Sequence, residues 1–371
     1  MIYSFPIFFL IISNWLSFAR SRSVHLIALI AFMPFVIFVA GFRYYSDTDY
    51  IPYVEIFNSL PVLFDFTIEV AKETYGEVGF LLLNSLVKTL GMPFFVVTIL
   101  AALFSITAKT YFAFKYSSSA FIVLTLYFCL HFVTTEFSEL RWSIATGFIL
   151  LGYNSFLKKN ITFAIIFFMV AISFHYSAIM AIFILLGLLI ASNRFWLCVF
   201  FVSLVVAIVF KSYPIQVYLN LGVDLYAFER LQRYLNDPSS NVGLFSILKV
   251  SLYPLAYCAL GKFISRSGSD TSLYSSHILL ERLSLIYIST ALVCSFVPIF
   301  FLRLAPLVDF LSILVLVLYI DRIPSHVLRV YLKLVCTILF GAWYCISLSK
   351  SLLVPMEEGG LGLYRSIFET Y

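Results

Sequence analysis

The chain has 371 residues and a formal net charge of +5; 62% of its residues are hydrophobic, 12% are charged, and the mean hydropathy is +1.01. Soluble domains are roughly one-quarter charged, so this composition excludes a soluble enzyme or binding module and gives no sign of a nucleic-acid partner. A helix that crosses a bilayer needs roughly 20 apolar residues, and runs of that length recur throughout the sequence. We therefore predict an all-α, polytopic transmembrane helical bundle, with residues 1–371 forming a single integral membrane domain.

The apolar runs predict about twelve spans. They lie near residues 2–19, 24–41, 93–114, 119–138, 141–157, 161–177, 177–193, 195–211, 244–264, 278–297, 303–320 and 328–348. The run 78–90 is too short to span alone, so we expect a re-entrant or interfacial helix that leads into the third span.

Charge placement predicts the orientation of these spans. No Lys or Arg precedes the first apolar run, whereas basic residues follow it, which favours an outer amino terminus. The basic turns then lie on the cytoplasmic side; they contain Arg20, Arg22, Lys109, Lys115, Lys158, Lys159, Arg194, Lys262, Arg266, Arg322 and Arg329. Only Asp270, Glu281 and Asp321 share that side, which leaves 16 of the 19 acids outside or in the outer half of the membrane. The polar chemistry is therefore expected at the periplasmic face.

Two outer segments are long: periplasmic loop 1 at about 42–77 and periplasmic loop 2 at about 211–243. Loop 1 is the most polar stretch of the chain and mixes acids and bases with tyrosines. Long structured loops on one face of a bundle commonly carry a lid or a binding site. These two loops are the first places to look for function.

The sequence gives no indication of a metal, cofactor or nucleotide site. The six cysteines each stand alone in an apolar run, without a CxxC motif or a neighbouring histidine pair, so neither a disulfide nor a zinc site is expected. Walker A, GxGxxG and HExxH motifs are all missing from the sequence.

Five short motifs follow one another between about residues 40 and 310. They are GFRYYSDTDYIPYVEIF, EVGFLLLNSLVKTLG, LRWSIATG, SFHYSA and FLRLAP. Each motif is weak alone, but their order and spacing over most of the chain resemble the Wzy/EpsG type of bacterial polysaccharide (O-antigen) polymerase.

This resemblance implies a metal-independent, GT-C-like glycosyltransferase of the bacterial cytoplasmic (inner) membrane, active on its periplasmic face without a cofactor. Its substrate would be an oligosaccharide linked to undecaprenyl pyrophosphate, held among membrane lipid. The implied reaction moves a growing glycan from that carrier to the sugar end of an incoming lipid-linked repeat unit. The chain-length regulator and the flippase of the same pathway are the implied protein partners. The matching positions are Arg43, Asp49, Tyr50, Glu77, Gly79, Arg141, His175 and Arg303.

Three arginines from separate stretches, Arg43, Arg141 and Arg303, are predicted at the outer end of the bundle. Guanidinium groups bind phosphate oxygens bidentately, so together they could hold a diphosphate leaving group. The alternative for each is an arginine that extends to the interface and packs its stem on apolar surface. Arg230 and Arg233 in loop 2 either clamp phosphate on closure or form a solvated helical face.

Four groups are candidates for acid–base work or for binding the leaving group. The acceptor hydroxyl must lose a proton, and Asp47, Asp49 and Glu77 are the candidate bases. Asp49 also fits a cap for the helix that follows it, and Glu77 also fits a simple ion pair with an arginine. His175 fits a general base, a donor to phosphate, or a hydrogen-bonded structural residue.

The tyrosines of loop 1 are candidate sugar contacts. Four of them, Tyr44, Tyr45, Tyr50 and Tyr53, stand among charged residues, where flat rings could stack on sugars. Most tyrosines of the chain fit the aromatic belt of a membrane protein. Asp309 in the eleventh span needs a partner because an unpaired carboxylate is costly in a membrane, and Lys249 is the candidate.

Two other functions use the same substrate. An O-antigen ligase-like transferase would share the donor chemistry and differ in the acceptor. A flippase or other transporter of the lipid-linked oligosaccharide would gather its polar residues near the membrane midplane, from two structural repeats. No such repeat is visible, and the acids gather on one predicted face, which favours the polymerase.

Overall fold

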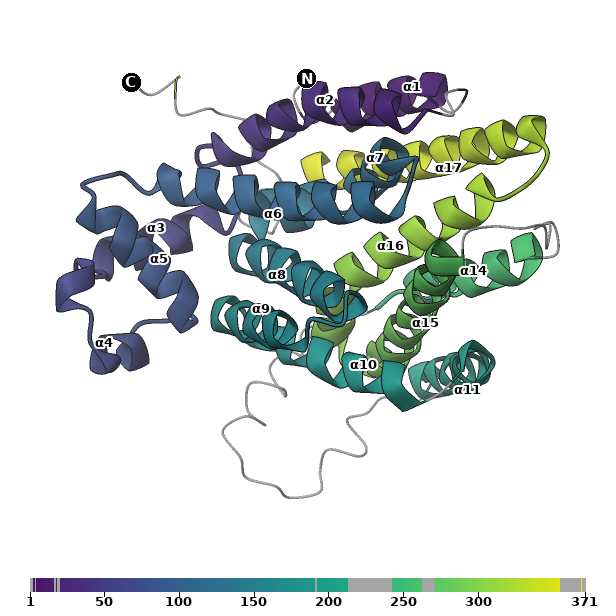
Figure 1. Ribbon diagram of the computed structural model, residues 1–371. Helices are drawn as coiled ribbons and strands as arrows, with labels where there is room; N and C mark the ends of the chain where they lie inside the picture. Colours follow the sequence, from purple (N-terminus) through teal and green to yellow (C-terminus); the bar gives the residue numbers. More distant parts are fainter. Residues whose placement is uncertain are drawn as a thin grey trace. The chain divides into compact units, whose positions relative to one another are not determined.

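The computed structural model of the protein describes residues 3, 5–16, 18, 21–190, 192–212, 242–261, 271–353 and 368. These residues form helices joined by short turns, without a β-strand among them, which confirms the all-α prediction (Figure 1). Arg230 and Arg233, with most of loop 2, lie outside this part of the chain.

The helices follow the predicted apolar runs closely. In chain order they are α1 (Phe5–Leu16), α2 (Arg22–Gly41), α3 (Tyr50–Ser59), η2 (Leu63–Asp65), α4 (Ile68–Glu73), α5 (Val78–Thr89), α6 (Phe95–Tyr116), α7 (Ala120–His131), η3 (Phe132–Ser138), α8 (Leu140–Leu157), α9 (Ile161–Phe174), η4 (Tyr176–Ala178), α10 (Ile179–Ile190), α11 (Asn193–Ser212), α14 (Leu244–Gly261), α15 (Thr271–Val293), η6 (Cys294–Phe296), α16 (Pro298–Asp321) and α17 (His326–Leu353). Most are α-helices; η2, η4 and η6 are short 3₁₀-helices, and η3 is a π-helix that continues α7.

Seven helical segments in the described ranges are long and apolar enough to cross a membrane. They are Arg22–Gly41, Phe95–Tyr116, Ala120–Ser138, Leu244–Gly261, Ser276–Val293, Pro298–Asp321 and His326–Leu353. The chain is therefore a membrane protein by length and composition of its helices. Shorter or less apolar helices occupy the other predicted spans, so crossing by all twelve stays a prediction.

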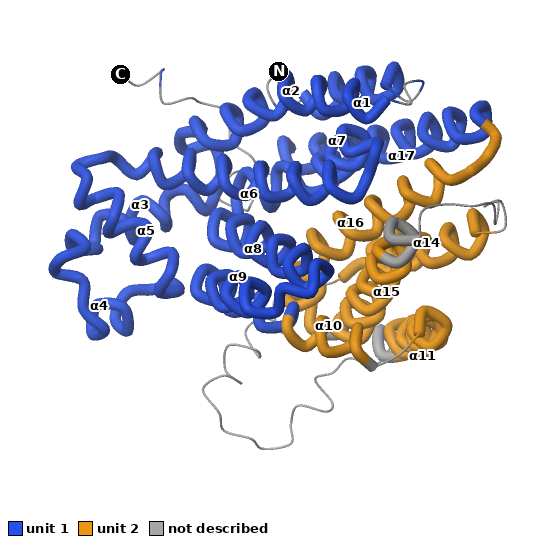
Figure 2. Tube along the Cα trace, viewed as in Figure 1, with its two compact units in different colours: residues 1–181, 326–371 blue, residues 182–325 orange. Residues whose placement is uncertain are grey.

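The chain divides into two compact units (Figure 2). Unit 1 contains residues 1–181 and 326–371, and unit 2 contains residues 182–325. In unit 1, α6 packs against α2, α7 and α8, while α8 packs against α9. In unit 2, α15 packs against both α11 and α16, and α14 packs against α16.

Hydrogen bonds fix the direction of the unit 1 helices. The Thr98 hydroxyl near the start of α6 donates to the carbonyl of Gly41 at the end of α2, at 2.6 Å. At the other end of the pair, the Arg22 guanidinium donates to the carbonyl of Phe114, at 2.5 Å. The Tyr116 hydroxyl donates to Asn154 near the end of α8, at 3.1 Å. Therefore α2 runs antiparallel to α6 and α8 runs parallel to it, so the end of α2 and the start of α8 lie at the same end of unit 1.

One predicted basic turn is wrong in part. Lys109 does not border the turn after α6; it is 1% exposed inside that helix and pairs with Glu136 at 2.8 Å. Lys115 follows near the helix end, and Lys158 lies beside it because its ammonium contacts the Tyr111 hydroxyl at 3.5 Å. The basic end of unit 1 thus keeps Arg22, Lys115 and Lys158 but loses Lys109.

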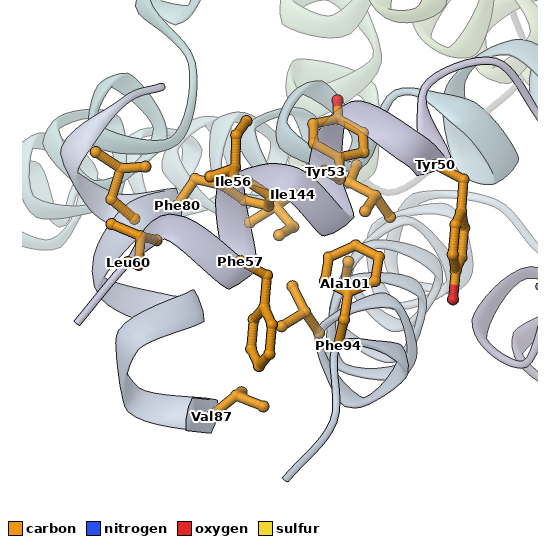
Figure 3. Packing of buried hydrophobic residues seen from close by; sticks show 13 residues of the cluster. Tyr50, Tyr53, Ile56, Phe57, Leu60, Phe80, Val87, Phe94, Ala101 and Ile144 are labelled. Atoms are coloured by element: carbon orange, nitrogen blue, oxygen red, sulfur yellow. The ribbon is translucent and has the colours of Figure 1, made fainter. Parts of the chain in front are cut away.

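Loop 1 is folded and packed against unit 1. It runs between the end of α2 at Gly41 and the start of α5 at Val78, which matches its predicted limits of 42–77, and it contains α3, η2 and α4. A buried apolar cluster joins α3 to α5, α6 and α8 (Figure 3); it consists of Tyr50, Tyr53, Ile56, Phe57, Leu60, Phe80, Leu81, Val87, Phe94, Val97, Ala101, Leu140 and Ile144. The predicted helix 78–90 is confirmed as α5.

A lysine from α5 also closes α3. The Lys88 ammonium donates to the carbonyls of Asn58 at 2.8 Å and Phe57 at 3.2 Å, in the last turn of that helix. A positive charge at a helix carboxyl end satisfies the free carbonyls and offsets the helix dipole. Loop 1 is therefore held by side-chain bonds as well as by apolar packing.

Candidate active site

An ion pair joins loop 1 to the start of α8. The Arg141 Nη1 atom lies 2.7 Å from the Glu77 Oε2 atom, and the two side chains are 15% and 7% exposed. Glu77 is the N-cap residue of α5, and Arg141 is the second residue of α8. The pair lies at the end of unit 1 where α2 ends, so the structure brings these two predicted site residues together.

Gly79 explains how Glu77 reaches this position. A Cβ atom at Gly79 would lie 2.5 Å from the Ser173 Oγ atom and 2.8 Å from the Ser173 carbonyl oxygen, near the end of α9. Only a residue without a side chain allows α5 to approach α9 so closely. The approach lets the Tyr176 backbone N–H donate to the other Glu77 oxygen, at 3.4 Å.

Aromatic rings surround the Arg141 guanidinium. Its central carbon lies 5.1 Å from the ring centroid of Tyr75 and 5.8 Å from that of Tyr53, distances typical of cation–π contacts. Its Nε atom is buried and has no hydrogen-bond partner among the described residues. The guanidinium therefore keeps a donor that a ligand could use after a small movement of the side chain.

The two most exposed rings near this ion pair belong to tyrosines that the sequence analysis did not select. Tyr75 is 64% exposed beside Arg141, and Tyr176, whose backbone binds Glu77, is 63% exposed. Tyr75 lies two residues before the motif EVGFLLLNSLVKTLG and Tyr176 lies within SFHYSA, and that position was the available signal.

Two of the four predicted sugar contacts are buried instead. Tyr50 is 2% and Tyr53 is 6% exposed, because α3 turns them towards α5 and α6 (Figure 3). The Tyr50 ring meets Phe94 edge-on at 5.3 Å. A buried ring face cannot stack on a sugar, so the prediction is wrong for these two side chains in this conformation. Tyr44 and Tyr45 are half-buried, and for them the role stays a prediction.

Tyr53 contributes in another way. Burial raises the pKa of Tyr53 to about 12, although the nearby Arg141 charge opposes the increase. The phenol is therefore neutral near pH 7 and is a hydrogen-bond donor rather than a base. Asp49 lies one helical turn before Tyr53, since the Tyr53 N–H donates to the Asp49 carbonyl at 3.2 Å.

Asp49 does not cap α3 as one interpretation predicts. It occupies the N-cap position, but its side chain accepts no hydrogen bond from the helix start. Instead the Asp47 carboxylate accepts the Asp49 backbone N–H, at 3.1 Å. Asp49 is half-buried, whereas Asp47 and Glu77 are 1% and 5% exposed. Of the three candidate bases, Asp49 is thus the most accessible.

Arg43 and Asp47 form a second ion pair, fully enclosed. The Arg43 Nε atom lies 2.7 Å from the Asp47 Oδ2 atom, and the residues are 0% and 1% exposed. The Arg43 Nη1 atom donates to the carbonyl of Ala40 at 2.7 Å, and its guanidinium carbon lies 4.9 Å from the Phe137 ring centroid. This arrangement fixes the turn after α2 and leaves neither residue open to a substrate in this conformation, contrary to the prediction.

His175 lies between α9 and η4. Its Nδ1 atom accepts the Ser177 backbone N–H at 3.2 Å, so the neutral ring carries its proton on Nε2. Its ring packs edge-on against the ring of Trp142, the residue after Arg141, with 5.0 Å between the ring centroids. Of the roles predicted for His175, this geometry fits a hydrogen-bond donor better than a general base.

Unit 2 holds Arg303 and the predicted ion pair of α16. Arg303 is half-buried near the start of that helix. The Asp309 carboxylate binds the Lys249 ammonium at 2.7 Å and the Tyr253 hydroxyl at 3.0 Å, which confirms the predicted partner. Elsewhere in this unit, a cavity of about 180 Å³ is lined by residues such as Asn193, Glu281 and Tyr319, and by none of the predicted site residues.

The family model that matches the sequence is that of the EpsG family, over residues 26–357. The chain belongs to the EpsG family. This confirms the resemblance drawn from the five motifs, and the match includes loop 1 and the starts of α8 and α16. The EpsG-family chain matches no curated protein and no solved structure. The expected GT-C-like architecture therefore stays a prediction.

Proposed function

We propose that this EpsG-family protein polymerises O-antigen or another bacterial surface polysaccharide. It transfers a growing glycan from undecaprenyl pyrophosphate to the sugar end of an incoming lipid-linked repeat unit, at the periplasmic face of the cytoplasmic membrane. Family membership supports a polymerase-like role, and the apolar helices support a membrane location. The observation that carries the proposal is the partly buried Arg141–Glu77 pair with tyrosines on its exposed side.

Arg141 binds the diphosphate of the donor in this proposal. Its Nε atom is buried and has no hydrogen-bond partner among the described residues. The Arg141 side chain is largely shielded from water, so its hydrogen bond to a phosphate oxygen is stronger there than in water. Arg303 of unit 2 is proposed as a further cation that binds phosphate of the lipid-linked substrate. Positive charge at the leaving group lowers the barrier because negative charge accumulates there in the transition state.

The reaction is a displacement at the anomeric carbon of the donor. The acceptor hydroxyl oxygen bonds to that carbon while the bond from the carbon to the diphosphate oxygen breaks, so the configuration inverts. The hydroxyl proton passes to Asp49, the most accessible of the three acids, and the electron pair leaves with the prenyl diphosphate. Glu77 orients Arg141, and His175 donates a hydrogen bond from Nε2 to the substrate.

Purified protein and a single-repeat lipid-linked substrate test this function directly. A ladder of product lengths is expected, because each product is itself a donor for the next transfer. One discrete product on a different acceptor would show a ligase. Intact substrate in detergent, together with movement of the same lipid across liposome membranes, would show a transporter.

Tyr75 and Tyr176 are expected to bind the sugars. Replacing either ring by alanine should raise KM by about three- to tenfold with little change in kcat, since one aromatic contact contributes roughly 0.5–1.5 kcal/mol. Steady-state rates at several concentrations of the lipid-linked substrate measure both constants.

Conservative and distant variants serve as controls for these rings. Tyr75→Phe and Tyr176→Phe keep the ring face and should keep KM. Tyr331→Ala removes a comparably exposed ring, 59% exposed on α17, and should change neither constant. An unchanged KM in both alanine variants would show that sugars bind elsewhere.

A further inference from the structure

A charged pair is buried inside the apolar part of unit 1. The Lys109 ammonium lies 2.8 Å from the Glu136 Oε1 atom, and the side chains are 1% and 0% exposed. Lys109 belongs to α6 and Glu136 to the segment Ala120–Ser138, both of which are candidate membrane spans. Taking two charges out of water is costly, and charges within membrane helices commonly mark functional positions.

Every strong hydrogen-bonding group of the pair has a partner. Glu136 accepts from the Tyr127 hydroxyl at 2.9 Å and from the Ser105 hydroxyl at 2.6 Å. Lys109 donates to the hydroxyls of Ser105 at 2.5 Å and Thr146 at 2.9 Å. These bonds join α6, α7, η3 and α8. The network is therefore a fixed point to which several elements of unit 1 are attached.

Glu136 lies in the π-helix η3, a rare geometry that occurs frequently at functional sites. The wide turn continues α7 and ends at Ser138, and the Glu139 N–H then bonds to the Thr134 carbonyl at 3.1 Å before α8 begins. A π-helical turn adds a residue to the ladder and so rotates everything that follows. The bonds to Glu136 select which rotation is kept.

Two arginines of the predicted site depend on this π-helix: Arg43 contacts a residue inside it, and Arg141 follows it in the chain. Phe137 is buried and lies under the Arg43 guanidinium at 4.9 Å. Arg141 follows in the first turn of α8 and binds Glu77. A shift of Glu136 along or around the helix would therefore move the surroundings of Arg43 and the side chain of Arg141 together.

We propose that the Lys109–Glu136 pair positions Arg141. The pair holds η3 in one register, meaning one rotation of the chain that follows it about the helix axis, and thereby orients Arg141 towards the diphosphate of the lipid-linked substrate. Apolar residues could fill this site with comparable stability. They would not select one π-helical register, because apolar packing is not directional. The role given to Arg141 rests on the proposed function, whereas the effect on register does not.

The test compares single and double replacements in the full chain, in lipid nanodiscs. Lys109→Met and Glu136→Gln each leave one buried charge without its partner and should lower the melting temperature. The double variant leaves no unpaired charge and should recover it. The probe is farnesyl diphosphate, with farnesol as the matching alcohol. We expect the wild-type protein to prefer the diphosphate and the stable double variant to bind it about tenfold more weakly, as for other losses of orienting residues.

Hydrogen exchange on the same samples, measured without ligand, reports on the register of η3. Backbone amides over residues 132–143 should exchange faster in the double variant than in the wild type, although the melting temperatures agree. Tyr127→Phe is a milder second variant, since it removes one bond to Glu136 and keeps the pair. It should weaken diphosphate binding by about threefold, within the range measured for a single lost hydrogen bond.

The Lys249–Asp309 pair is the matched control. It is another short ion pair, at 2.7 Å, with a buried carboxylate, and it joins α14 and α16 in unit 2. The double variant Lys249→Met with Asp309→Asn should keep both diphosphate affinity and exchange over 132–143. Loss in this control, or wild-type affinity and exchange in the Lys109/Glu136 double variant, would overturn the positioning role. A wild-type protein that binds diphosphate and alcohol equally would instead contradict the proposed function, and hydrogen exchange would still decide the register.

Discussion

Arg141→Ala is expected to leave the protein in the membrane and to abolish long glycan chains, so that single repeat units remain on the lipid carrier. Arg141 sits in the first turn of α8, where alanine is compatible with the helix. The lost interaction is one that strengthens as the leaving group gains charge, and removal of one such donor lowers the rate by about 100- to 1,000-fold. Gel analysis of extracted polysaccharide gives chain length, and immunoblotting of membranes gives protein amount.

Three further variants belong to this experiment, and the first separates charge from geometry. Arg141→Lys keeps the charge but loses the forked pair of donors, so short chains are expected rather than none. Arg22→Ala removes an exposed arginine at the other end of unit 1 and should give wild-type chains. Arg303→Ala is likewise expected to leave the protein in the membrane and to abolish long chains. Wild-type ladders from Arg141→Ala and Arg303→Ala would remove both residues from the active site.

The helices and the limits of loop 1 could be predicted because they depend on local composition. Apolar runs predict where helices form, and the polar stretch 42–77 ends where α5 begins. The Asp309–Lys249 pair could be predicted as well. An unpaired carboxylate in an apolar helix is costly, so Asp309 requires a cationic partner. Each of these predictions depends on the composition of a single segment or on one large free-energy cost.

Lys109 shows where local composition is insufficient. A lysine late in an apolar run looks the same whether it borders water or binds a carboxylate on another helix. The deciding partner, Glu136, lies in a π-helix, and hydropathy does not predict a π-helix. The orientation rule counts such a lysine as cytoplasmic. Its burial removes one charge from the predicted inner side but keeps the remaining basic end of unit 1 in place.

The prediction of sugar contacts at Tyr50 and Tyr53 was wrong for a different reason. Their abundance in loop 1 predicts contact with sugars, yet α3 has one face against α5 and α6, and Tyr50 and Tyr53 occupy that face. Tyr75 lies in the turn between α4 and α5, and Tyr176 lies in the short η4 helix, where neither ring is covered. Residue type therefore indicated the chemistry of the site, but only tertiary packing determined which rings stay open.

Gly79→Ala is expected to be nearly as damaging as loss of Arg141, although Gly79 would touch no substrate. The new methyl group would lie 2.8 Å from the Ser173 carbonyl oxygen and 2.9 Å from its carbonyl carbon, and backbone atoms cannot rotate away. Overpacking of this kind costs about 1–3 kcal/mol of stability. Relief requires α5 to move from α9, which carries Glu77 away from Arg141 and from the Tyr176 N–H.

Activity should therefore fall more than stability does. A displacement of about 1 Å at a catalytic group can cost roughly 100-fold in rate, so kcat/KM should drop by that order while the protein remains folded in the membrane. Gly243→Ala is the matched control, because a Cβ atom there meets only one atom, at 4.0 Å. A second change, Ser173→Gly, removes the Ser173 side chain. It should restore little activity to Gly79→Ala, because the new methyl group also clashes with the Ser173 backbone. Full rescue by Ser173→Gly would show that the clash is with the Ser173 side chain and not with its backbone. Wild-type activity in Gly79→Ala would show that the close approach of α5 and α9 does not position Glu77.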